Sequence, residues 1–328
     1  MLRLPKADIS QHHQLHQLRN RAKVISQIRA FFAARDVLEV DTPVMSHYGV
    51  SDPHIDSIPV TFTPDGTSIG HSMYLMSSPE YAMKRLLAAG SGCIYQIAKA
   101  FRNGEAGRRH NPEFTLLEWY RLDFTLEQLM QEVANLIDIV LIDEVLEWHF
   151  WSYRQAFEEV LSINPLTASD DAIEAKALAH VDIQMDDSTP RDTWLDLLMS
   201  HCIEPQLPTA CFIYDYPASQ AALARTGIDE WGNKVARRFE VYVNGIELAN
   251  GYHELTDAQE QEQRFALDNA ARSAMSKVPM AADIRLIAAL QAGLPECSGV
   301  ALGVERLLML ASGEKDIAKV MAFNHHLA

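Results

Sequence analysis

Apolar residues recur every three or four positions over residues 13–35, from Leu15 to Phe32, and this spacing predicts an amphipathic helix. A short apolar run at residues 37–40 predicts a strand, which Pro43 ends because proline cannot continue a strand ladder. The first part of the chain is therefore predicted to be a long helix, a strand and a proline, in that order.

An antiparallel hairpin is predicted at residues 93–122. An apolar run ends at Arg102, a polar loop that contains glycine follows, and a β-prone run from Glu113 to Tyr120 returns. The loop concentrates positive charge through Arg102, Arg108, Arg109 and His110. The pattern thus predicts two strands joined by a long cationic loop.

The returning strand of this hairpin has two different faces. Strand alternation gives one face an aromatic ring, a carboxylate and a phenol, on Phe114, Leu116, Glu118 and Tyr120. The other face, with Thr115, Leu117 and Trp119, is typical of a hydrophobic core. A mixed polar face beside cations suits an anionic nucleotide together with a cationic small molecule. The alternative is an ordinary hairpin with a solvated loop.

Asn244 and Gly245, between two β-prone runs, predict a tight two-residue hairpin turn. Regular pairing from this turn places Tyr242 opposite Glu247 and Glu240 opposite Ala249. Glu240 and Glu247 then lie diagonally on one face, roughly 7–8 Å apart. Two carboxylates at this separation favour a Mg²⁺ site, completed by water and phosphate oxygens. The alternative is that both side chains face solvent.

Further polar residues are predicted to join the same region. A bend at Gly251 is expected to direct Asn250 and Glu254 back toward this region. Ser78, Pro79 and Glu80 begin a helix, because serine caps, proline suits the first turn and a carboxylate suits the positive helix end. Helix stability alone is therefore an alternative explanation for Glu80.

A strand of small residues is predicted near the carboxyl end. Gly299, Ala301 and Gly303 alternate along residues 297–303, so one face is nearly bare and a flat ligand can lie on it. Arg306 falls in the first turn of the following helix, where its charge opposes the helix dipole. An anionic or aromatic ligand explains Arg306 better than helix stability does.

Composition indicates a soluble globular protein, and 328 residues suffice for one large α/β domain or two ordinary ones. Residues 150–205 are mostly helical and no low-complexity linker is present, so we expect a single domain with an insertion at about residues 150–205. The N-terminus lacks the apolar core of a signal peptide, and no apolar run approaches the ~20 residues of a membrane helix. Four scattered cysteines indicate reduced thiols, and with them a cytoplasmic location. The formal net charge of −16 disfavours nucleic acid as a partner.

Taken in order, these stretches resemble the three signature motifs of class II aminoacyl-tRNA synthetases. The helix, strand and Pro43 resemble the first motif, which in that family forms the dimer interface. The segment from Arg102 to Phe114 resembles the second, and Gly299 to Arg306 the third. The resemblance implies a mixed α/β (α+β) fold, with an antiparallel sheet flanked by helices, and a homodimer.

Within the class, the chain resembles the lysine branch. Residues 109–120 (RHNPEFTLLEWY) and 245–257 (GIELANGYHELTD) are closely similar to the corresponding segments of that branch. About twenty residues precede the first-motif helix, so no anticodon-binding domain is expected. Residues 78–87 (SPEYAMKRLL), residues 217–224 (PASQAALA) and Ala301 narrow the resemblance to short paralogues that ligate a lysine-type amino acid to a lysine of elongation factor P. A tRNA partner and a membrane are not expected.

The resemblance implies a role for each matching residue. ATP is implied to bind at Arg102, Asn103, Gly104, His110, Asn111, Phe114, Glu247, Leu248, Gly303 and Arg306. The substrate, lysine or β-lysine, is implied to bind at Ser78, Pro79, Glu80, Glu118, Tyr120, Asn250, Glu254 and Ala301. The implied Mg²⁺ ligands are Glu240 and Glu247, and the implied catalytic residues are Arg102, Glu240, Glu247 and Arg306.

One position departs from the family pattern. The second motif of the family is Arg-x-Glu, whereas this chain has Gly104 two residues after Arg102 and Glu105 one place later. Either Glu105 turns into the site, helped by the freedom of Gly104, or a nucleotide contact is lost. Two other functions therefore stand beside amino-acid ligation to a protein: a minimal tRNA synthetase and a catalytically silent regulatory paralogue.

Overall fold

A large mixed sheet forms the centre of the protein. The computed structural model describes residues 11–142, 144–182 and 189–328. Nine strands form this sheet, in the order β1-β5-β6-β12-β11-β10-β8-β7 with β9 beside β10. β1 pairs with β5, and β7 with β8, in parallel, while the other pairs are antiparallel. The strands are β1 Leu38–Glu39, β5 Ile94–Phe101, β6 Glu113–Leu122, β7 Trp148–Ser152, β8 Ala210–Pro217, β9 Thr226–Ile228, β10 Lys234–Val243, β11 Ile246–His253 and β12 Cys297–Gly303.

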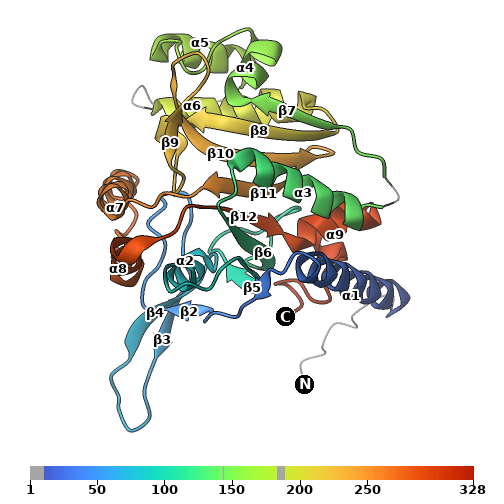
Figure 1. The fold of residues 1–328 in the computed structure, drawn as a ribbon, viewed down its shortest axis with the longest axis vertical. Helices are drawn as coiled ribbons and strands as arrows, with labels where there is room; N and C mark the ends of the chain where they lie inside the picture. Colours follow the sequence, from blue (N-terminus) through green and yellow to red (C-terminus); the bar gives the residue numbers. More distant parts are fainter. Residues whose placement is uncertain (1–10, 143, 183–188) are drawn as a thin grey trace, which may run out of the picture.

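Helices cover both faces of this sheet (Figure 1). The α-helices are α1 Gln11–Ala33, α2 Glu80–Ala88, α3 Leu126–Val140, α4 Tyr153–Leu161, α5 Asp170–His180, α6 Arg191–Leu198, α7 Ala258–Ala274, α8 Ile284–Gly293 and α9 Val304–Ser312. A short π-helix, Met199–Ile203, and 3-10 turns at Glu204–Gln206, Ala218–Gln220 and Ile317–Lys319 complete them. The expected antiparallel sheet flanked by helices is confirmed.

The hydrophobic core is divided between the two faces of the main sheet. On one face α1, α3 and α9 pack on the sheet around Phe32, Trp119 and Phe239. The opposite face is covered at one end by α2, α7 and α8. At its other end α4, α5 and α6 pack on β8 and β10. The sheet surface between these two helical groups is the floor of a cavity.

A smaller sheet lies beside the main one. β2 (Met45–Ser46), β4 (His71–Leu75) and β3 (Pro59–Phe62) pair antiparallel in the order β2-β4-β3. The β3–β4 hairpin projects from the lower left of Figure 1. The loop between β2 and β3 runs back along the cavity, so this region supplies one of the cavity walls.

The first predicted hairpin forms as expected. β5 and β6 pair from Ile94 with Tyr120 to Phe101 with Glu113. The predicted division of faces also holds, since Leu117 and Trp119 are fully buried in the core while Phe114 and Glu118 line the cavity. After the hairpin, Thr125 and Gln128 form a capping box that starts α3, and this helix ends at Val140.

The second hairpin forms with a different register. Asn244 and Gly245 have φ of 51° and 68°, as a two-residue hairpin turn requires, and Tyr242 pairs with Glu247 as expected. A β-bulge then shifts the pairing, so Glu240 pairs with Asn250 and not with Ala249. The predicted regular register was wrong, because one extra residue on β11 cannot be seen from strand alternation alone.

This bulge changes which residues share a face. In a regular strand Glu247 and Asn250 point to opposite sides of the sheet. With the extra residue between them, both line the same cavity, together with Tyr252. The bulge therefore brings Glu247, a predicted metal ligand, and Asn250, a predicted substrate residue, to the same cavity.

Residues 150–205 contain a strand as well as helices. β7 continues the main sheet beside β8, and the helices α4 to α6 form their own core with residues of β8 and β10. The segment thus shares a core with the main sheet. Among the described residues, no helix combines the length and the apolar character that crossing a membrane requires.

Candidate active site

One cavity of about 1100 Å³ holds most of the predicted site residues. Its floor is β6, β11 and β12, and its walls are α2, the loop before β3, α7 and the start of α6. The predicted residues that line it are Ser78, Glu80, Arg102, His110, Asn111, Phe114, Glu118, Tyr120, Glu247, Leu248, Asn250, Glu254, Ala301, Gly303 and Arg306. Pro79, Asn103, Gly104 and Glu240 lie next to lining residues but are not among them.

One end of the cavity is built around the carboxylate of Glu118. Ser78 Oγ donates to Glu118 Oε2 at 2.8 Å, and Tyr120 Oη donates to Oε1 at 2.7 Å. Ser78 Oγ also accepts from the Glu80 backbone N–H, so it links the start of α2 to the sheet. Burial, with the nearby charge of Glu80, raises the pKa of Glu118 to about 8. This carboxyl is poised to ionise when a cation arrives.

Two further carboxylates at this end share a single lysine. Lys84 Nζ lies 2.6 Å from Glu80 Oε1 and 2.6 Å from Glu254 Oε2. Burial, opposed by the charge of Lys84, raises the pKa of Glu254 to about 7. Among the described residues, no hydrogen-bond partner contacts Glu254 Oε1, although this atom is buried. A buried acceptor without a donor, in a cavity, fits the ammonium group of a ligand.

Gly299 allows these groups to converge. A Cβ at this position would lie 2.3 Å from Tyr120 Cε1 and 2.5 Å from Glu254 Oε1. The bare face predicted for the strand of small residues is therefore occupied here by the tyrosine ring and the carboxylate. Further along β12, Ala301 and Gly303 line the cavity and leave the sheet surface open.

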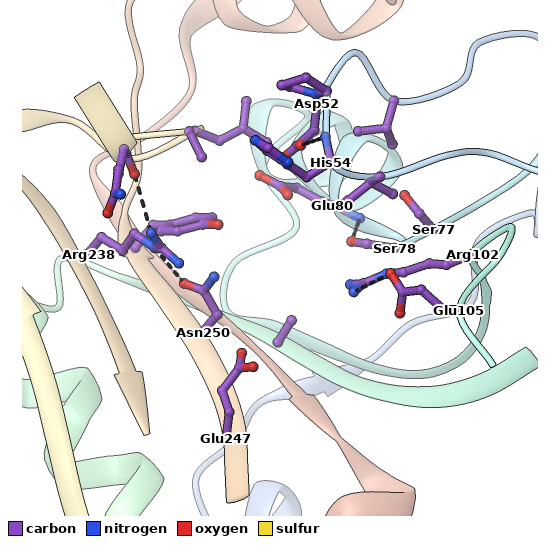
Figure 2. Close-up of a pocket in the computed structure, with 18 of the residues that line it drawn as sticks. Asp52, His54, Ser77, Ser78, Glu80, Arg102, Glu105, Arg238, Glu247 and Asn250 are labelled. Carbon is purple, nitrogen blue, oxygen red and sulfur yellow. Dashed lines mark hydrogen bonds and ion pairs between the residues drawn. The ribbon is translucent and has the colours of Figure 1, made fainter. Parts of the chain in front are cut away.

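The other end of the cavity carries cations and an aromatic ring. Arg102 lies over the Phe114 ring, with Cζ 5.1 Å from the ring centroid, and pairs with Glu105 at 3.6 Å. Figure 2 shows Glu105 beside Arg102 at the cavity. Gly104 has φ of +80°, a conformation that favours glycine, and its neighbour Glu105 lines the cavity. Glu105 thus lies at the cavity, as the first of the two alternatives for this loop requires, and its contact with a nucleotide stays a prediction.

Arg306 joins the second and third motifs. Its guanidinium donates to the Glu247 carbonyl oxygen at 2.8 Å and contacts His110 Nε2 at 2.7 Å. Burial and the charge of Arg306 lower the pKa of His110, so this histidine is neutral and its Nε2 can accept the hydrogen bond. Arg109 donates to the Gly245 carbonyl oxygen at 2.9 Å, which ties the loop to the turn of the second hairpin.

Glu240 lies at the edge of the site. Its carboxylate pairs with Arg238 and accepts from Tyr242 Oη at 2.5 Å. Arg238 also donates to Asn250 Oδ1 at 3.2 Å, and Figure 2 shows these two side chains together on the cavity wall. In the part of the chain that the structure describes, no group of at least three potential metal ligands is assembled. The metal role of Glu240 and Glu247 therefore stays a prediction.

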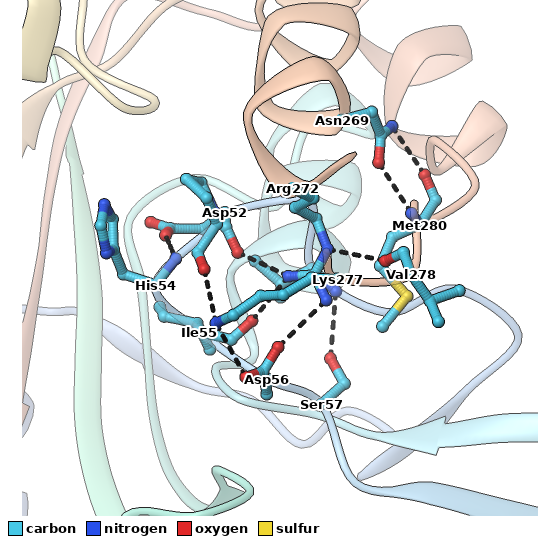
Figure 3. Close-up of polar contacts among 12 residues, drawn as sticks. Asp52, His54, Ile55, Asp56, Ser57, Asn269, Arg272, Lys277, Val278 and Met280 are labelled. Carbon is cyan, nitrogen blue, oxygen red and sulfur yellow. Dashed lines mark hydrogen bonds and ion pairs between the residues drawn. The ribbon is translucent and has the colours of Figure 1, made fainter. Parts of the chain in front are cut away.

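The loop before β3 is held by a buried arginine of α7 (Figure 3). Arg272 donates to the carbonyl oxygens of Asp52, Ile55 and Val278 at 2.8 to 3.2 Å and to Asp56 Oδ1 at 3.0 Å. Lys277 adds contacts to Pro53 O and Asp56 Oδ2 at 2.8 and 2.9 Å. Residues 50–55 therefore form a fixed wall of the cavity.

Sequence reasoning missed several residues of the site. Lys84 has a detectable signal, since it lies one helical turn after Glu80. The sequence also contains a signal for Arg238, because this residue shares a strand face with Glu240. Asp52, His54 and Asp196 reach the cavity only through the tertiary fold, and no local pattern indicates them.

Comparison with known proteins agrees with this arrangement. Residues 2–326 match the family of tRNA synthetases class II (D, K and N). The chain belongs to this family. The resemblance found in the three motifs is therefore confirmed, and the mostly antiparallel sheet flanked by helices is the class II synthetase fold.

Among class II synthetase relatives, several share about half of their residues with this chain. The protein named elongation factor P–(R)-β-lysine ligase of Vibrio cholerae is 51% identical over 325 residues, which cover 98% of this chain and 97% of the relative. The proteins of the same name from Proteus mirabilis and Salmonella gallinarum are each 50% identical, over 97% and 93% of this chain and 97% and 94% of the relative.

Proposed function

We propose that this chain activates a lysine-type amino acid, β-lysine or α-lysine, with ATP and transfers it to a lysine of elongation factor P. The observation that carries the proposal is the polarity of the cavity. The buried carboxylates of Glu118 and Glu254 and the half-buried carboxylate of Glu80 lie at one end, and Arg102 and Arg306 lie at the other. The names and the nearly complete alignment of the relatives support the same activity.

The carboxylate end suits the ammonium groups of the amino acid. Removing an ammonium group from water is costly unless carboxylates and hydrogen bonds replace the water. Glu118 is held by Ser78 and Tyr120, and Glu254 has a free buried oxygen, so both can accept from an ammonium group. We infer that the side-chain ammonium binds at Glu118, Tyr120 and Glu254, with the other amino group near Glu80.

The cationic end suits the nucleotide. In the proposed reaction the substrate carboxylate attacks the α-phosphorus of ATP in line, which forms the aminoacyl-adenylate and releases pyrophosphate. Arg102 stabilises the charge that develops on the α-phosphate. The adenine ring is proposed to lie between Phe114 and Arg306, in the space above Gly303. The activation step needs neither a covalent nucleophile nor a general base.

The residues near β11 fit a divalent cation. Glu204 lies near Glu240 and Glu247, and burial together with the charges of these two carboxylates raises the pKa of Glu204 to about 7. Glu247 lines the cavity, and two protein carboxylates with phosphate oxygens are a typical Mg²⁺ shell. We propose Glu240 and Glu247 as ligands. When bound, Mg²⁺ would neutralise phosphate charge.

Transfer completes the proposed reaction. The neutral ε-amine of the acceptor lysine attacks the carbonyl carbon of the adenylate, an amide bond forms and AMP leaves. The net charge of −16 is consistent with a protein acceptor rather than tRNA, because tRNA binding gains affinity from a basic surface. The position of Glu105 at the cavity argues for an active enzyme rather than a silent paralogue.

The assembly and organisation of the chain are part of the proposal. We propose a single catalytic domain with residues 150–205 as an insertion, acting in the cytoplasm as a homodimer. Leu15 and Leu18 on α1 are 53% and 45% exposed, which supports a dimer interface on this first-motif helix.

Pyrophosphate exchange tests the function directly. The purified protein is expected to catalyse exchange with α-lysine or β-lysine, to label elongation factor P with the radioactive amino acid, and to leave tRNA uncharged. Elongation factor P with its acceptor lysine changed to arginine is the control. Efficient charging of tRNA, or no exchange with any lysine isomer, would overturn the proposal.

A further inference from the structure

Lys84 is the most deeply buried cation at the carboxylate end of the cavity. Lys84 is 1% exposed, and its ammonium group contacts the carboxylates of both Glu80 and Glu254. Lys84 itself does not line the cavity, whereas Glu80 and Glu254 do. It therefore lies behind the carboxylates and cannot contact a ligand in front of them.

The charges at this end can be counted. Ionised Glu80, Glu118 and Glu254 contribute three negative charges, and Lys84 contributes one positive charge, so the net charge is −2. A lysine-type amino acid carries two ammonium groups, and these balance that charge. Its carboxylate extends toward the cations at the opposite end.

The geometry also fixes the two carboxylates that Lys84 contacts. Both distances are 2.6 Å, and the lysine comes from the same helix as Glu80, one turn later. Glu254 Oε2 is thereby held, and Oε1 is left directed toward Gly299, inside the cavity. Lys84 donates a hydrogen bond to Glu80 and forms an ion pair with Glu254, and such charged contacts at short distance keep a carboxylate in one orientation.

We propose that Lys84 is a positioning residue that makes the cavity specific for a diammonium amino acid: it orients Glu80 and Glu254 and sets the net charge at −2. The inference rests on the proposed function, because it concerns the substrate that the same site selects. With Lys84 present, the site offers two unbalanced negative charges. Without it, the three ionised carboxylates, two of them buried, have no cation among them, and one of them takes up a proton instead of binding an ammonium group.

The variant Lys84→Gln tests this role, because glutamine retains hydrogen-bond donors but removes the charge. At pH 7 we expect the KM for lysine to rise about tenfold or more. This is the effect of raising by about one unit the pKa of a carboxyl group that must ionise before lysine can bind. The KM for ATP is expected to change less than twofold. Because Lys84 lowers the pKa of Glu254, the variant should regain affinity for lysine as the pH is raised from 7 to 9. The wild type should gain less affinity over this range, because Lys84 keeps the pKa of its Glu254 lower, and the ionisation of Glu118 contributes to both profiles.

Two comparisons make the outcome decisive. Lys84→Arg keeps the charge and is expected to retain the wild-type pH profile. Norleucine, which lacks the side-chain ammonium, is expected to compete better against lysine in Lys84→Gln than in the wild type. A wild-type pH profile in Lys84→Gln, or equal losses for ATP and lysine, would contradict the inference.

Two further measurements cover a failure to fold or a failure of the proposed function. If Lys84→Gln does not fold, the double variant Glu80→Gln/Lys84→Gln is used, because it returns the net charge to −2. This double variant is expected to fold. If it is unfolded, the proposed charge balance is wrong. If the wild type catalyses no exchange, the proposed function fails, and calorimetric binding of lysine to wild type and Lys84→Gln still tests Lys84. Equal affinities of the two proteins over pH 7–9 would then refute its role.

Discussion

Gly299 leaves no space for a side chain at the carboxylate end of the cavity. A methyl group there would overlap both the Tyr120 ring and Glu254 Oε1. Both side chains are held by other contacts, Tyr120 through Glu118 and Glu254 through Lys84. Neither can move aside without disturbing the network of carboxylates, so this glycine determines how closely they approach the sheet.

The variant Gly299→Ala is therefore expected to lose affinity for lysine by about tenfold or more, since overpacking of this kind typically costs about 1–3 kcal/mol. ATP binding at the opposite end should be nearly unchanged. Calorimetric titration with each ligand measures both. Gly107→Ala is a matched control, because a Cβ at position 107 meets no atom within 4 Å. Equal weakening of ATP and lysine binding by Gly299→Ala would show that the effect is not local.

Individual residues could be predicted from the sequence where strand alternation determines their direction. This applies to Phe114, Glu118 and Tyr120, which line the cavity as expected. Lys84 could not be predicted in its role, because its second partner, Glu254, is 170 positions away in the chain and only the fold brings them together. Local patterns give the face of a strand, but they do not give the partner of a buried charge.

Among the elements, the loop between β5 and β6 is held to the rest of the protein at several points. Arg108 donates to the Lys315 carbonyl oxygen at 3.0 Å, and Arg109 donates to the carbonyl oxygen of Gly245. Asn111 accepts from the backbone N–H of His325 at 3.0 Å. The cations of this loop thus have different tasks: Arg108 and Arg109 fasten it, and Arg102 remains directed into the cavity.

Within this loop, Glu105→Gln should raise the KM for ATP by about three- to tenfold, the range for loss of one hydrogen bond of ordinary strength. The reason is that Glu105 pairs with Arg102 at the nucleotide end. The KM for lysine should stay the same, and steady-state pyrophosphate exchange measures both constants. Glu113→Gln is the control, because Glu113 pairs with Lys99 outside the cavity. An unchanged KM for ATP in Glu105→Gln would mean that the nucleotide contact is absent.

The elements themselves could be predicted more fully than their pairing. Both hairpins were expected from the apolar runs and from Asn244 and Gly245, and both are present. The bulge on β11 was not expected, because a single extra residue leaves the composition of the strand unchanged and is specified by the neighbouring strands. β7 was also missed, since its five residues join the sheet through β8, about sixty positions later.

For the molecule as a whole, carboxyl groups in and near the cavity have raised pKa values. Burial raises the pKa of Glu118 to about 8 and those of Glu204 and Glu254 to about 7. In the unfolded chain these carboxyls titrate near 4.3. Between pH 6.5 and 8, the folded protein therefore holds protons that the unfolded chain has already released.

Stability of the ligand-free protein should consequently fall as the pH rises through this window. A raised carboxyl pKa contributes stability below the unfolded pKa, and this contribution is lost as the pH passes the folded value. We expect the free energy of unfolding in urea to decrease by on the order of 2 kcal/mol from pH 6.5 to 8. The lowered pKa of His110 acts in the opposite direction, but mainly below this window.

The matched variant is Glu118→Gln, which removes the carboxyl with the highest of these pKa values and should flatten the pH dependence. Saturating lysine should flatten it as well, because the ammonium groups replace the protons. A stability that rises between pH 6.5 and 8 would contradict the assignment of these carboxyls.

The arginine that holds the loop before β3 has a consequence for how this cavity can change. Arg272 contacts residues 52, 55 and 278 only through their carbonyl oxygens, and Lys277 contacts residue 53 in the same way. Carbonyl oxygens are present whatever the side chain. The loop side chains that face the cavity, such as His54, can therefore be exchanged while the wall keeps its position. This wall is the natural place to begin engineering the enzyme for new amino acids.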